Sequence, residues 1–392
     1  MKELRFDILP GLNCNFRCKY CYEKGQYENT KWEIETIRKT IDFIVNAYNL
    51  LKSDEELQLH LFFWGGEPLL YIDEIYYLVK AVRRKLPDIR IISNVTTNGY
   101  LIKDNLHRLK DIDKVSDLRV NVSYDYYMQD MTRMPNTYQI IRDNITLLFE
   151  NNILARTITT FTAQNLKYFY ETIKDYYDFI SNPVNINKFQ YNIDYDCAYN
   201  DTDINFDEKA FISSLKKARK YVIDNNLNAD MIRNNTHCSK REGFSRNVLV
   251  QKIVNNDMEE LYNIYDGAFF GGVFCCIDYQ GIIRTGMASF FSPNRNDFIL
   301  GTLNDSPETI IQSYRNLVDK TYNKNIINDI SKCVDCQNDC KLNYLRTIKN
   351  NDITTLHSMP NPIWCRIHDL LVEYKMCRNK DISFMLPHQA SD

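Results

Sequence analysis

The sequence lacks any long hydrophobic run. No stretch approaches the ~18 apolar residues of a membrane-spanning helix, and the amino terminus has no basic head followed by an apolar segment. Neither sign of charge is in excess, because 48 basic residues stand against 51 acidic ones and no dense Lys/Arg cluster occurs. These absences predict a cytoplasmic protein and argue against nucleic-acid and membrane partners.

The chain has 392 residues, enough for one large or two medium domains with an ample core. Its 12 cysteines are more informative than its length. Because no secretion signal is present, we expect metal ligands or catalytic thiols rather than disulfides.

Three closely spaced cysteines near the amino terminus form the most informative motif. Cys14, Cys18 and Cys21 follow an apolar run at residues 4–9 that predicts a strand. Three thiolates can hold three irons of a cubane [4Fe-4S] cluster, and no fourth cysteine lies nearby. One iron would then stay open for a substrate or cofactor.

A structural zinc site and unrelated buried thiols are the alternative interpretations of the same cysteines. A zinc site would need a fourth ligand at short range. The nearest candidates, Glu23 and His60, are poor ones.

The cysteine spacing, the aromatic Tyr20 before the third cysteine and the position after the first strand resemble the radical S-adenosylmethionine (SAM) enzymes. The resemblance implies a [4Fe-4S] cluster whose open iron chelates the amino and carboxylate groups of SAM. It also implies that one electron, from a flavodoxin or ferredoxin-type donor, cleaves SAM to methionine and a 5'-deoxyadenosyl radical. Tyr20 would then be a cofactor-binding residue.

Strands and helices alternate after the cysteine loop, which predicts an α/β fold with a parallel sheet. The arrangement resembles the partial (β/α)6 TIM-like barrel of the radical SAM family, with the ligand at the carboxyl ends of the strands. Strands are predicted at residues 4–9, 57–64, 89–97, 118–124, 153–162 and 188–194, and helices at residues 31–50, 72–86, 101–109, 138–151, 166–180 and 207–225.

The second predicted strand ends in Gly65, Gly66, Glu67 and Pro68. Glycine has no Cβ, so backbone groups here can approach a ligand closely. In radical SAM enzymes a Gly-Gly-Glu-Pro motif at this place binds the SAM amino group. The alternative is an ordinary turn before the next helix.

The next strand ends hold further residues for which the resemblance implies SAM contacts. The third strand ends in Thr97 and Asn98, and the fourth in Ser123 and Asp125. Arg133 resembles the family arginine that pairs with the methionyl carboxylate, for which a guanidinium fork is suited. Strand-end capping or a surface charge is the alternative for these side chains.

Two positions depart from the family pattern. Tyr126 stands where relatives usually have glycine after the Ser-x-Asp sequence, which puts the local backbone shape in doubt. Gln129 stands where a histidine commonly precedes the arginine by four positions.

A second cysteine group lies near the carboxyl terminus. Cys333, Cys336, Cys340 and Cys365 supply four thiolates, enough for a complete [4Fe-4S] cluster or a four-cysteine zinc site. The region resembles the SPASM/twitch extension of peptide-modifying radical SAM enzymes (RiPP maturases). Where the full pattern has two further cysteines the chain has Ala268 and Gly286, so we infer a reduced region with one auxiliary cluster.

Cys275 and Cys276 stand next to each other in a predicted hairpin. Neighbouring strand residues point to opposite faces, so at most one of them readily faces the barrel mouth. Three interpretations stay open: a core thiol, a replacement cluster ligand, or a catalytic thiol that gives a hydrogen atom to a substrate radical. Cys197, Cys238 and Cys377 are expected to be structural.

These features divide the chain into four segments. Residues 1–228 are expected to form the radical SAM partial barrel, 229–262 a bridge with a helix at 247–262, 263–362 the SPASM-like auxiliary cluster domain, and 363–392 a carboxy-terminal helix and tail.

The motifs together indicate an enzyme that modifies a peptide or protein by hydrogen abstraction. Thioether or carbon-carbon crosslinking of a short ribosomally synthesised precursor peptide is the leading reaction. Because the cysteine loop begins at Cys14, we expect no amino-terminal leader-binding domain, and a separate leader-binding protein becomes a candidate partner.

Three other functions remain alternatives. The first is peptide epimerisation with a cysteine hydrogen donor. The second is oxidation of a Cys or Ser in a sulfatase-like protein, which the missing inner-cluster ligands disfavour. The third is a non-catalytic iron-sulfur or zinc binding module, which the two intact motifs disfavour.

Overall fold

A computed structural model describes residues 2–21, 29–52, 57–181, 189–193, 206–227, 232–234, 273–285, 290, 295–321, 366–367, 370–371 and 373–374. Several predicted features lie outside these residues. They are the helix at 247–262, and Cys197, Cys238, Ala268, Gly286, Cys333, Cys336, Cys340, Cys365 and Cys377.

Strands and helices alternate as predicted, with ends that shift by a few residues. The strands are β1 (Lys2–Leu9), β2 (Leu57–Phe63), β3 (Ile91–Thr97), β4 (Asp117–Ser123), β5 (Leu154–Phe161), β6 (Phe189–Ile193) and β7 (Ile232–Asn234). The longer helices are α1 (Ile34–Leu51), α2 (Ile72–Lys85), α3 (Ile102–Asp113), α5 (Tyr138–Glu150), α6 (Phe169–Ser181) and α8 (Glu208–Asp224). Four short helices follow strand ends: η1 (Pro68–Tyr71), η2 (Tyr126–Met128), α4 (Gln129–Thr132) and η3 (Leu166–Tyr168).

These strands form one parallel sheet in sequence order. Each of β1 to β6 pairs in parallel with the next, and β7 pairs in parallel with β6. Parallel strands require a crossover between them, and the helices supply it. The predicted α/β fold with a parallel sheet is therefore confirmed for this part of the chain.

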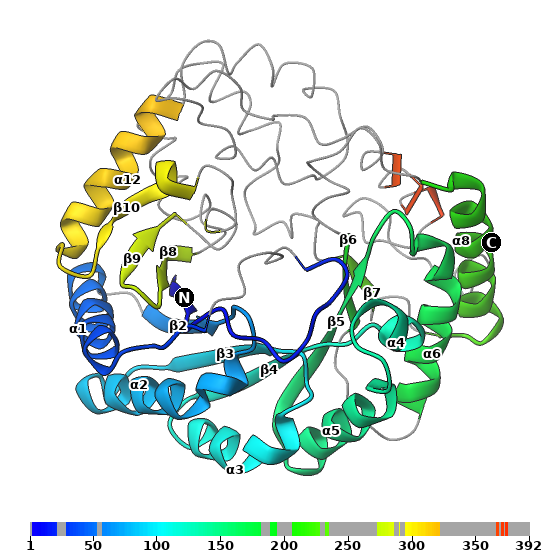
Figure 1. Cartoon of the computed structure of the whole chain (residues 1–392), viewed down its shortest axis with the longest axis horizontal. Helices are drawn as coiled ribbons and strands as arrows, with labels where there is room; N and C mark the ends of the chain where they lie inside the picture. The colour runs from blue at the N-terminus through cyan, green and yellow to red at the C-terminus, as the bar shows by residue number, and fades with distance from the viewer. Residues whose placement is uncertain are drawn as a thin grey trace, which may run out of the picture.

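The helices cover one face of the sheet (Figure 1). They bury the apolar side chains of that face. Alternate strand residues such as Phe6, Ile8 and Leu61 join the main hydrophobic core with helix residues such as Ile44 and Leu78. A period of two on the strands and of three to four on the helices brings these side chains together. The opposite, inner face of the sheet is left for the site.

Carboxy-terminal strands extend the sheet beyond β1. β8 (Val273–Asp278) pairs in parallel with β1, and β9 (Ile282–Arg284) and β10 (Ile299–Thr302) follow in antiparallel order. A short helix, η5 (Arg295–Phe298), precedes β10, and α12 (Pro307–Thr321) follows it. The predicted hairpin thus lies directly beside the strand that precedes the cysteine loop.

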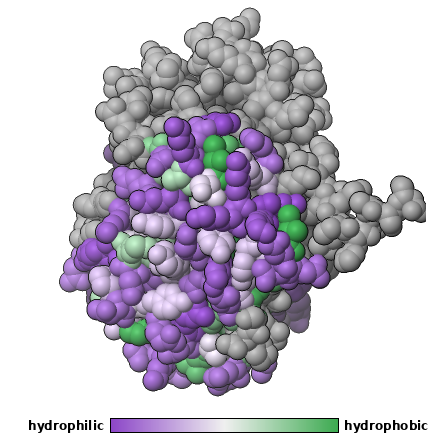
Figure 2. Space-filling model, turned by 90° about the vertical axis from the view of Figure 1, so that its right-hand side faces the viewer, coloured by the Kyte–Doolittle hydropathy of each residue, from purple (hydrophilic) through white to green (hydrophobic). Residues whose placement is uncertain are grey.

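The side of the molecule that carries α6 and α8 is mostly hydrophilic, with scattered apolar residues (Figure 2). Among the described residues, no helix is both long enough and apolar enough to cross a membrane.

Candidate functional site

The carboxyl ends of the parallel strands carry the candidate site. The loop after β1 holds Cys14, Cys18 and Cys21, whose thiols are all partly exposed. Backbone and side-chain bonds connect this loop to the ends of β2, β3 and β4. Motifs that lie far apart in the sequence therefore meet at one edge of the sheet, as the rule for α/β barrels predicts.

Two residues that the sequence patterns did not single out fix the start of the loop. Thr30 Oγ1 accepts a hydrogen bond from the Leu12 amide at 2.8 Å, and it lies 2.8 Å from the Tyr71 hydroxyl. Gly11 passes so close that an added Cβ would lie 2.1 Å from that hydroxyl. Position 11 consequently has no room for a side chain.

Gly65 and Gly66 hold the middle of the loop by close backbone approach. An added Cβ at Gly66 would lie 2.3 Å from the carbonyl oxygen of Asn13, and Gly65 has φ +135°, which L side chains rarely adopt. The Gly66 amide donates to the Gly11 carbonyl at 3.2 Å, and the Glu67 amide donates to the Asn13 carbonyl at 2.8 Å. Both glycines are needed for packing against the cysteine loop, whatever ligand is bound.

Glu67 points into the protein and joins the end of β2 to the end of β3. One carboxylate oxygen accepts from Thr97 Oγ1 at 2.7 Å and from the Leu69 amide at 3.0 Å, and the other accepts from the Asn98 amide at 2.8 Å. The side chain is fully buried, and Pro68 after it starts η1. Glu67 thus acts on the site by positioning the strand ends.

Glu67 should make the stability of the protein depend on pH. Burial raises the pKa of its carboxyl to about 6, from 4.5, although three donors favour the charged form. The folded state therefore keeps a proton that the unfolded state has lost, so stability falls as pH rises through this window. We expect the free energy of unfolding to fall by about 2 kcal/mol between about pH 3.5 and 7, relative to Glu67→Gln, with most of the fall between pH 4.5 and 6.

Denaturant titrations of both proteins across this range measure the difference. An identical pH dependence in the two proteins would contradict the prediction.

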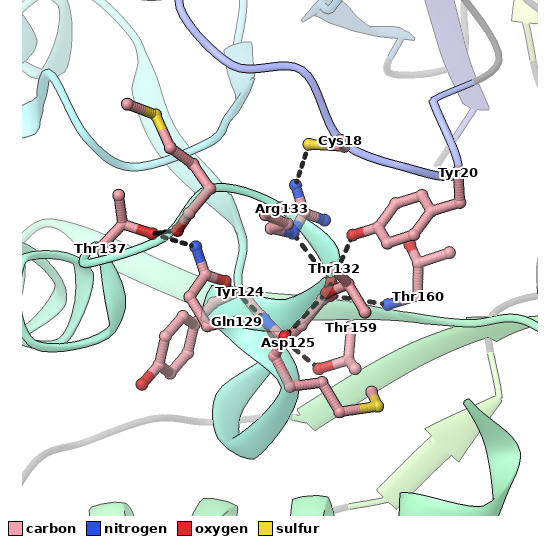
Figure 3. Close-up of polar contacts among 12 residues, drawn as sticks. Cys18, Tyr20, Tyr124, Asp125, Gln129, Thr132, Arg133, Thr137, Thr159 and Thr160 are labelled. Carbon is pink, nitrogen blue, oxygen red and sulfur yellow. Dashed lines mark hydrogen bonds and ion pairs between the residues drawn. The ribbon is translucent and has the colours of Figure 1, made fainter. Parts of the chain in front are cut away.

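Asp125 is the hub of a second polar network, at the end of β4 (Figure 3). Its carboxylate accepts from the Tyr20 hydroxyl at 2.5 Å, from Thr132 Oγ1 at 2.6 Å and from the Thr160 amide at 3.0 Å. Arg133 Nε lies 3.2 Å away as an ion pair, and all of these groups are buried or half-buried. Asp125 therefore ties the cysteine loop to β4 and β5.

Arg133 lies between this carboxylate and the cysteine loop. Its Nη1 lies 3.7 Å from Cys18 Sγ, and its Cζ lies 5.3 Å from the centre of the Tyr20 ring. Burial alone would lower the pKa of the guanidinium, but Asp125, Tyr20 and Cys18 hold it above its usual value. A fixed positive charge consequently lies next to a thiol of the loop.

The structure accommodates both departures from the family pattern, Tyr126 and Gln129. Tyr126 adopts φ +50°, the left-handed conformation that a glycine would take without strain. The centre of its buried ring lies 4.4 Å from the centre of the Tyr124 ring, and its hydroxyl forms a hydrogen bond with Thr157 Oγ1 at 2.8 Å. Gln129 accepts from the Asp125 amide and donates to Thr137, both at 3.0 Å, so it supports the same turn.

Asn98, just after β3, and Ser123, at the end of β4, differ in their contacts with the rest of the site. Asn98 Nδ2 donates to Asn15 at 2.7 Å and lies 4.0 Å from Cys14 Sγ. Ser123 is half-exposed, and its hydroxyl has no hydrogen bond to any residue that the structure describes. Ser123 is accordingly the predicted residue that is best placed to meet a ligand.

The donor set around the loop fits an iron-sulfur cluster better than one metal ion. In the described ranges, no three His, Cys, Asp or Glu side chains converge on a point where one ion could be held. In a cubane cluster, by contrast, each cysteine binds a different iron. N–H donors near the cysteine sulfurs then change the reduction potential of the cluster. Cys14 has such donors in Asn98 and the Phe16 amide, the latter at 3.4 Å, and Cys18 has Arg133.

Cys275 and Cys276 point to opposite faces of β8, as predicted. Cys275 is buried in the main core between the sheet and the helices. Cys276 is buried on the inner face, in a second apolar cluster with Leu9, Leu12 and Trp64. Burial, with nearby acidic groups, raises the pKa of both thiols well above the usual range, so both are protonated.

Part of the chain is similar to known proteins. Residues 8–176 match the model of the radical SAM superfamily. An uncharacterized Methanocaldococcus jannaschii protein, MJ0907, is 29% identical over 182 residues, which are 44% of this chain and 58% of that protein. The GTP 3',8-cyclase of Nautilia profundicola is 33% identical over 123 residues, 29% of this chain and 32% of the cyclase. The chain thus matches from about a third to just over half of these relatives.

Two solved structures share the fold over most of the chain. anSMEcpe, solved with bound AdoMet and the Kp18Cys peptide, gives a TM-score of 0.62 at 16% identity and covers 95% of this chain and 96% of its own. Streptococcus suis SuiB, solved with its precursor peptide SuiA, gives a TM-score of 0.54 at 15% identity and covers 88% of this chain and 71% of its own. At this identity the likeness concerns the fold alone.

Proposed function

We propose, from the match of residues 8–176 to the model of the radical SAM superfamily, that the chain is a radical SAM enzyme that modifies a peptide or protein by hydrogen abstraction. The leading reaction is a thioether or carbon-carbon crosslink in a ribosomally synthesised peptide. The observation that carries the proposal is the meeting of Cys14, Cys18 and Cys21 with Asn98 and Arg133 at one edge of the sheet.

The residues of this edge have separate tasks in the proposed enzyme. When bound, a [4Fe-4S] cluster and SAM supply the one-electron chemistry that removes a hydrogen atom from the substrate. The three cysteines would hold the irons, and Asn98 and Arg133 place N–H donors next to the sulfurs of Cys14 and Cys18. The hydroxyl of Ser123, which has no partner among the residues that the structure describes, and the backbone at Gly65 and Gly66 would bind SAM.

Positioning and exclusion of water are the further contributions of the chain. Glu67 and Asp125 keep the strand ends in register, so that the reacting groups meet at short range. The buried cluster of Leu9, Leu12 and Trp64 lies next to the cysteine loop and keeps that side of the site dry.

A peptide substrate is supported by two proteins of the same fold, because anSMEcpe and SuiB have both been solved with bound peptides. The carboxy-terminal Cys333, Cys336, Cys340 and Cys365 would hold one auxiliary [4Fe-4S] cluster. A flavodoxin or ferredoxin-type protein would deliver the electrons, and a separate protein would bind the leader of the precursor peptide.

Peptide epimerisation is the second candidate, and the placement of Cys276 favours it. Its thiol lies on the inner face, next to Trp64, and its raised pKa keeps the hydrogen on sulfur. Cys275, in the core behind the sheet, is the matched control. In deuterated solvent, Cys276→Ala should abolish deuterium incorporation at the product Cα while SAM is still cleaved, and Cys275→Ala should not.

The proposed function is tested by iron content and SAM cleavage under anaerobic conditions. We expect about eight irons per chain, four in each of two cubane clusters, and the loss of about half in the Cys14→Ala/Cys18→Ala/Cys21→Ala variant. Reduced protein with SAM should release 5'-deoxyadenosine, and the variant should not. Zinc in place of iron, or intact clusters without SAM cleavage, would refute the proposal.

Substrate and reaction can be assigned with a precursor peptide that is encoded next to the gene of this protein. The peptide is co-expressed with the protein, and its mass is then measured by mass spectrometry. A loss of about 2 Da indicates a crosslink or an oxidation, because two hydrogens leave, whereas an unchanged mass indicates epimerisation.

A further inference from the structure

A line of tyrosines leads away from the candidate site. Tyr20, in the cysteine loop, donates its hydroxyl to Asp125 at 2.5 Å. Tyr124 precedes Asp125 in the chain, and its ring centre lies 6.0 Å from that of Tyr138 on α5. The path from Tyr20 to Tyr124 therefore runs through the hydrogen bond to Asp125 and the backbone that joins Asp125 to Tyr124. Tyr124 is fully buried and Tyr138 is partly exposed, so the path continues through the core toward solvent.

Tyr138 differs from Tyr124 in having a carboxylate partner. Its hydroxyl donates to Asp175 at 2.7 Å, and Arg142 bonds to the same carboxylate oxygen at 2.8 Å and to the hydroxyl at 2.9 Å. The Tyr124 hydroxyl lies 3.5 Å from the backbone carbonyl of Tyr138 and also interacts with the side chains of Tyr138 and Arg142, whereas the Asp175 carboxylate bonds to Tyr138 itself. A phenol loses its proton when it is oxidised, so an adjacent proton acceptor makes oxidation easier.

Asp175 is suited to take that proton. Its side chain is 16% exposed, and burial raises the pKa of its carboxyl above the usual value, which makes it a stronger base. Arg142 balances the charge when the phenol is neutral. The aromatic packing of α5 and α6 would be served equally well by phenylalanine at position 138, and it does not require the partly exposed pair of Asp175 and Arg142.

We propose that Tyr138 is a redox-active tyrosine. It supplies an electron, by way of Tyr124, that reduces an unwanted radical formed in the candidate site. A carbon radical that misses its substrate takes the hydrogen atom of the Tyr20 hydroxyl, so that a C–H bond forms and an O–H bond breaks. An electron then passes from Tyr138 by way of Tyr124 to Tyr20, which recovers a proton from solvent.

The proton of Tyr138 moves to Asp175, which leaves a neutral phenoxyl radical next to solvent. A thiol in solution reduces that radical by giving it a hydrogen atom, Asp175 returns its proton to solvent, and two thiyl radicals join as a disulfide. The tyrosines of the site are thereby returned to their reduced state, and a thiol in solution is oxidised instead. The source of the radical rests on the proposed function, whereas the redox property of Tyr138 does not.

The first test uses the cluster-loaded protein without SAM. Photo-oxidation by a ruthenium polypyridyl complex, with ring-deuterated tyrosine to identify the EPR signal, should give a long-lived tyrosyl radical. Tyr138→Phe and Asp175→Asn should lose this signal. Tyr176→Phe should keep it, because Tyr176 is a buried neighbour whose ring lies off the line, 5.7 Å from Tyr126.

The second test adds SAM and a reductant without substrate. The same radical should appear in the wild type and be lost in Tyr124→Phe, which keeps the ring and removes the oxidisable phenol, while 5'-deoxyadenosine still forms. A radical that survives in Tyr138→Phe, or is unchanged in Tyr124→Phe, would overturn the proposal. Absence of 5'-deoxyadenosine in the wild type would refute the proposed function, and the photo-oxidation result alone then decides the role of Tyr138.

Discussion

Arg133→Met should destabilise the protein by about 3–5 kcal/mol, because it leaves the buried carboxylate of Asp125 without its cation. The Asp125 side chain has no exposed surface and the Arg133 side chain is 7% exposed, so water cannot replace the lost charge. Unfolding in denaturant without SAM measures the effect on the fold alone. Methionine keeps most of the volume, so the change in charge dominates.

A double variant and a surface pair complete this experiment. Arg133→Met/Asp125→Asn removes both charges and should recover much of the lost stability, since an absent buried pair costs less than a broken one. Lys85→Met breaks an exposed pair with Asp42, at 3.1 Å, and should cost less than about 1 kcal/mol. Equal costs for Arg133→Met and Lys85→Met would contradict the role of burial.

The alternation of strands and helices could be predicted because each element carries a local hydrophobic period. α1 buries Ile37, Ile41 and Ile44 at helical spacing. β2 buries Leu59, Leu61 and Phe63 on one face, although His60 between them is buried too. The pairing of β8 with β1 could not be predicted in this way. Phe6 and Cys275 are neighbours in the sheet although they lie 269 positions apart in the chain, and no local pattern encodes that contact.

The candidate site was predictable as a set of residues but not as a set of bonds. Cys14 and Arg133 were identified from motif resemblance, and the structure brings both to one edge of the sheet. That Glu67 faces inward was not predictable, because the motif specifies its place and not its rotamer. Thr30 and Tyr71 were missed because they act through single hydroxyl contacts across the loop, which leave no periodic signal.

Tyr126 shows how a departure from a family pattern can be explained only in three dimensions. Sequence comparison marks the missing glycine as a doubt about the backbone. The structure keeps the left-handed backbone and compensates for its strain with a fully buried ring and a bond to Thr157. A cost of about 1–2 kcal/mol for the conformation is offset by the burial of a large side chain, worth about 1.5–3 kcal/mol.

Gly66→Ala should reduce SAM cleavage by about 100-fold, the loss expected when reacting groups move by about 1 Å. The new Cβ would lie 2.3 Å from the carbonyl oxygen of Asn13 and 2.6 Å from that of Leu12, and both are backbone atoms. The cysteine loop must therefore shift, since no side chain can rotate away. Iron content should fall together with SAM cleavage, because Cys14 follows Asn13 directly.

Gly301→Ala is the matched control for this prediction. Its Cβ would also meet close atoms, Ile310 Cδ1 at 2.6 Å and Asp305 Oδ2 at 2.9 Å, but these are the ends of side chains that can rotate, and they lie away from the cysteine loop. This variant should fold, load iron and cleave SAM like the wild type. If Gly66→Ala did the same, close backbone approach at Gly66 could not be what holds the loop in place, and a role of Gly66 in binding SAM would be contradicted as well.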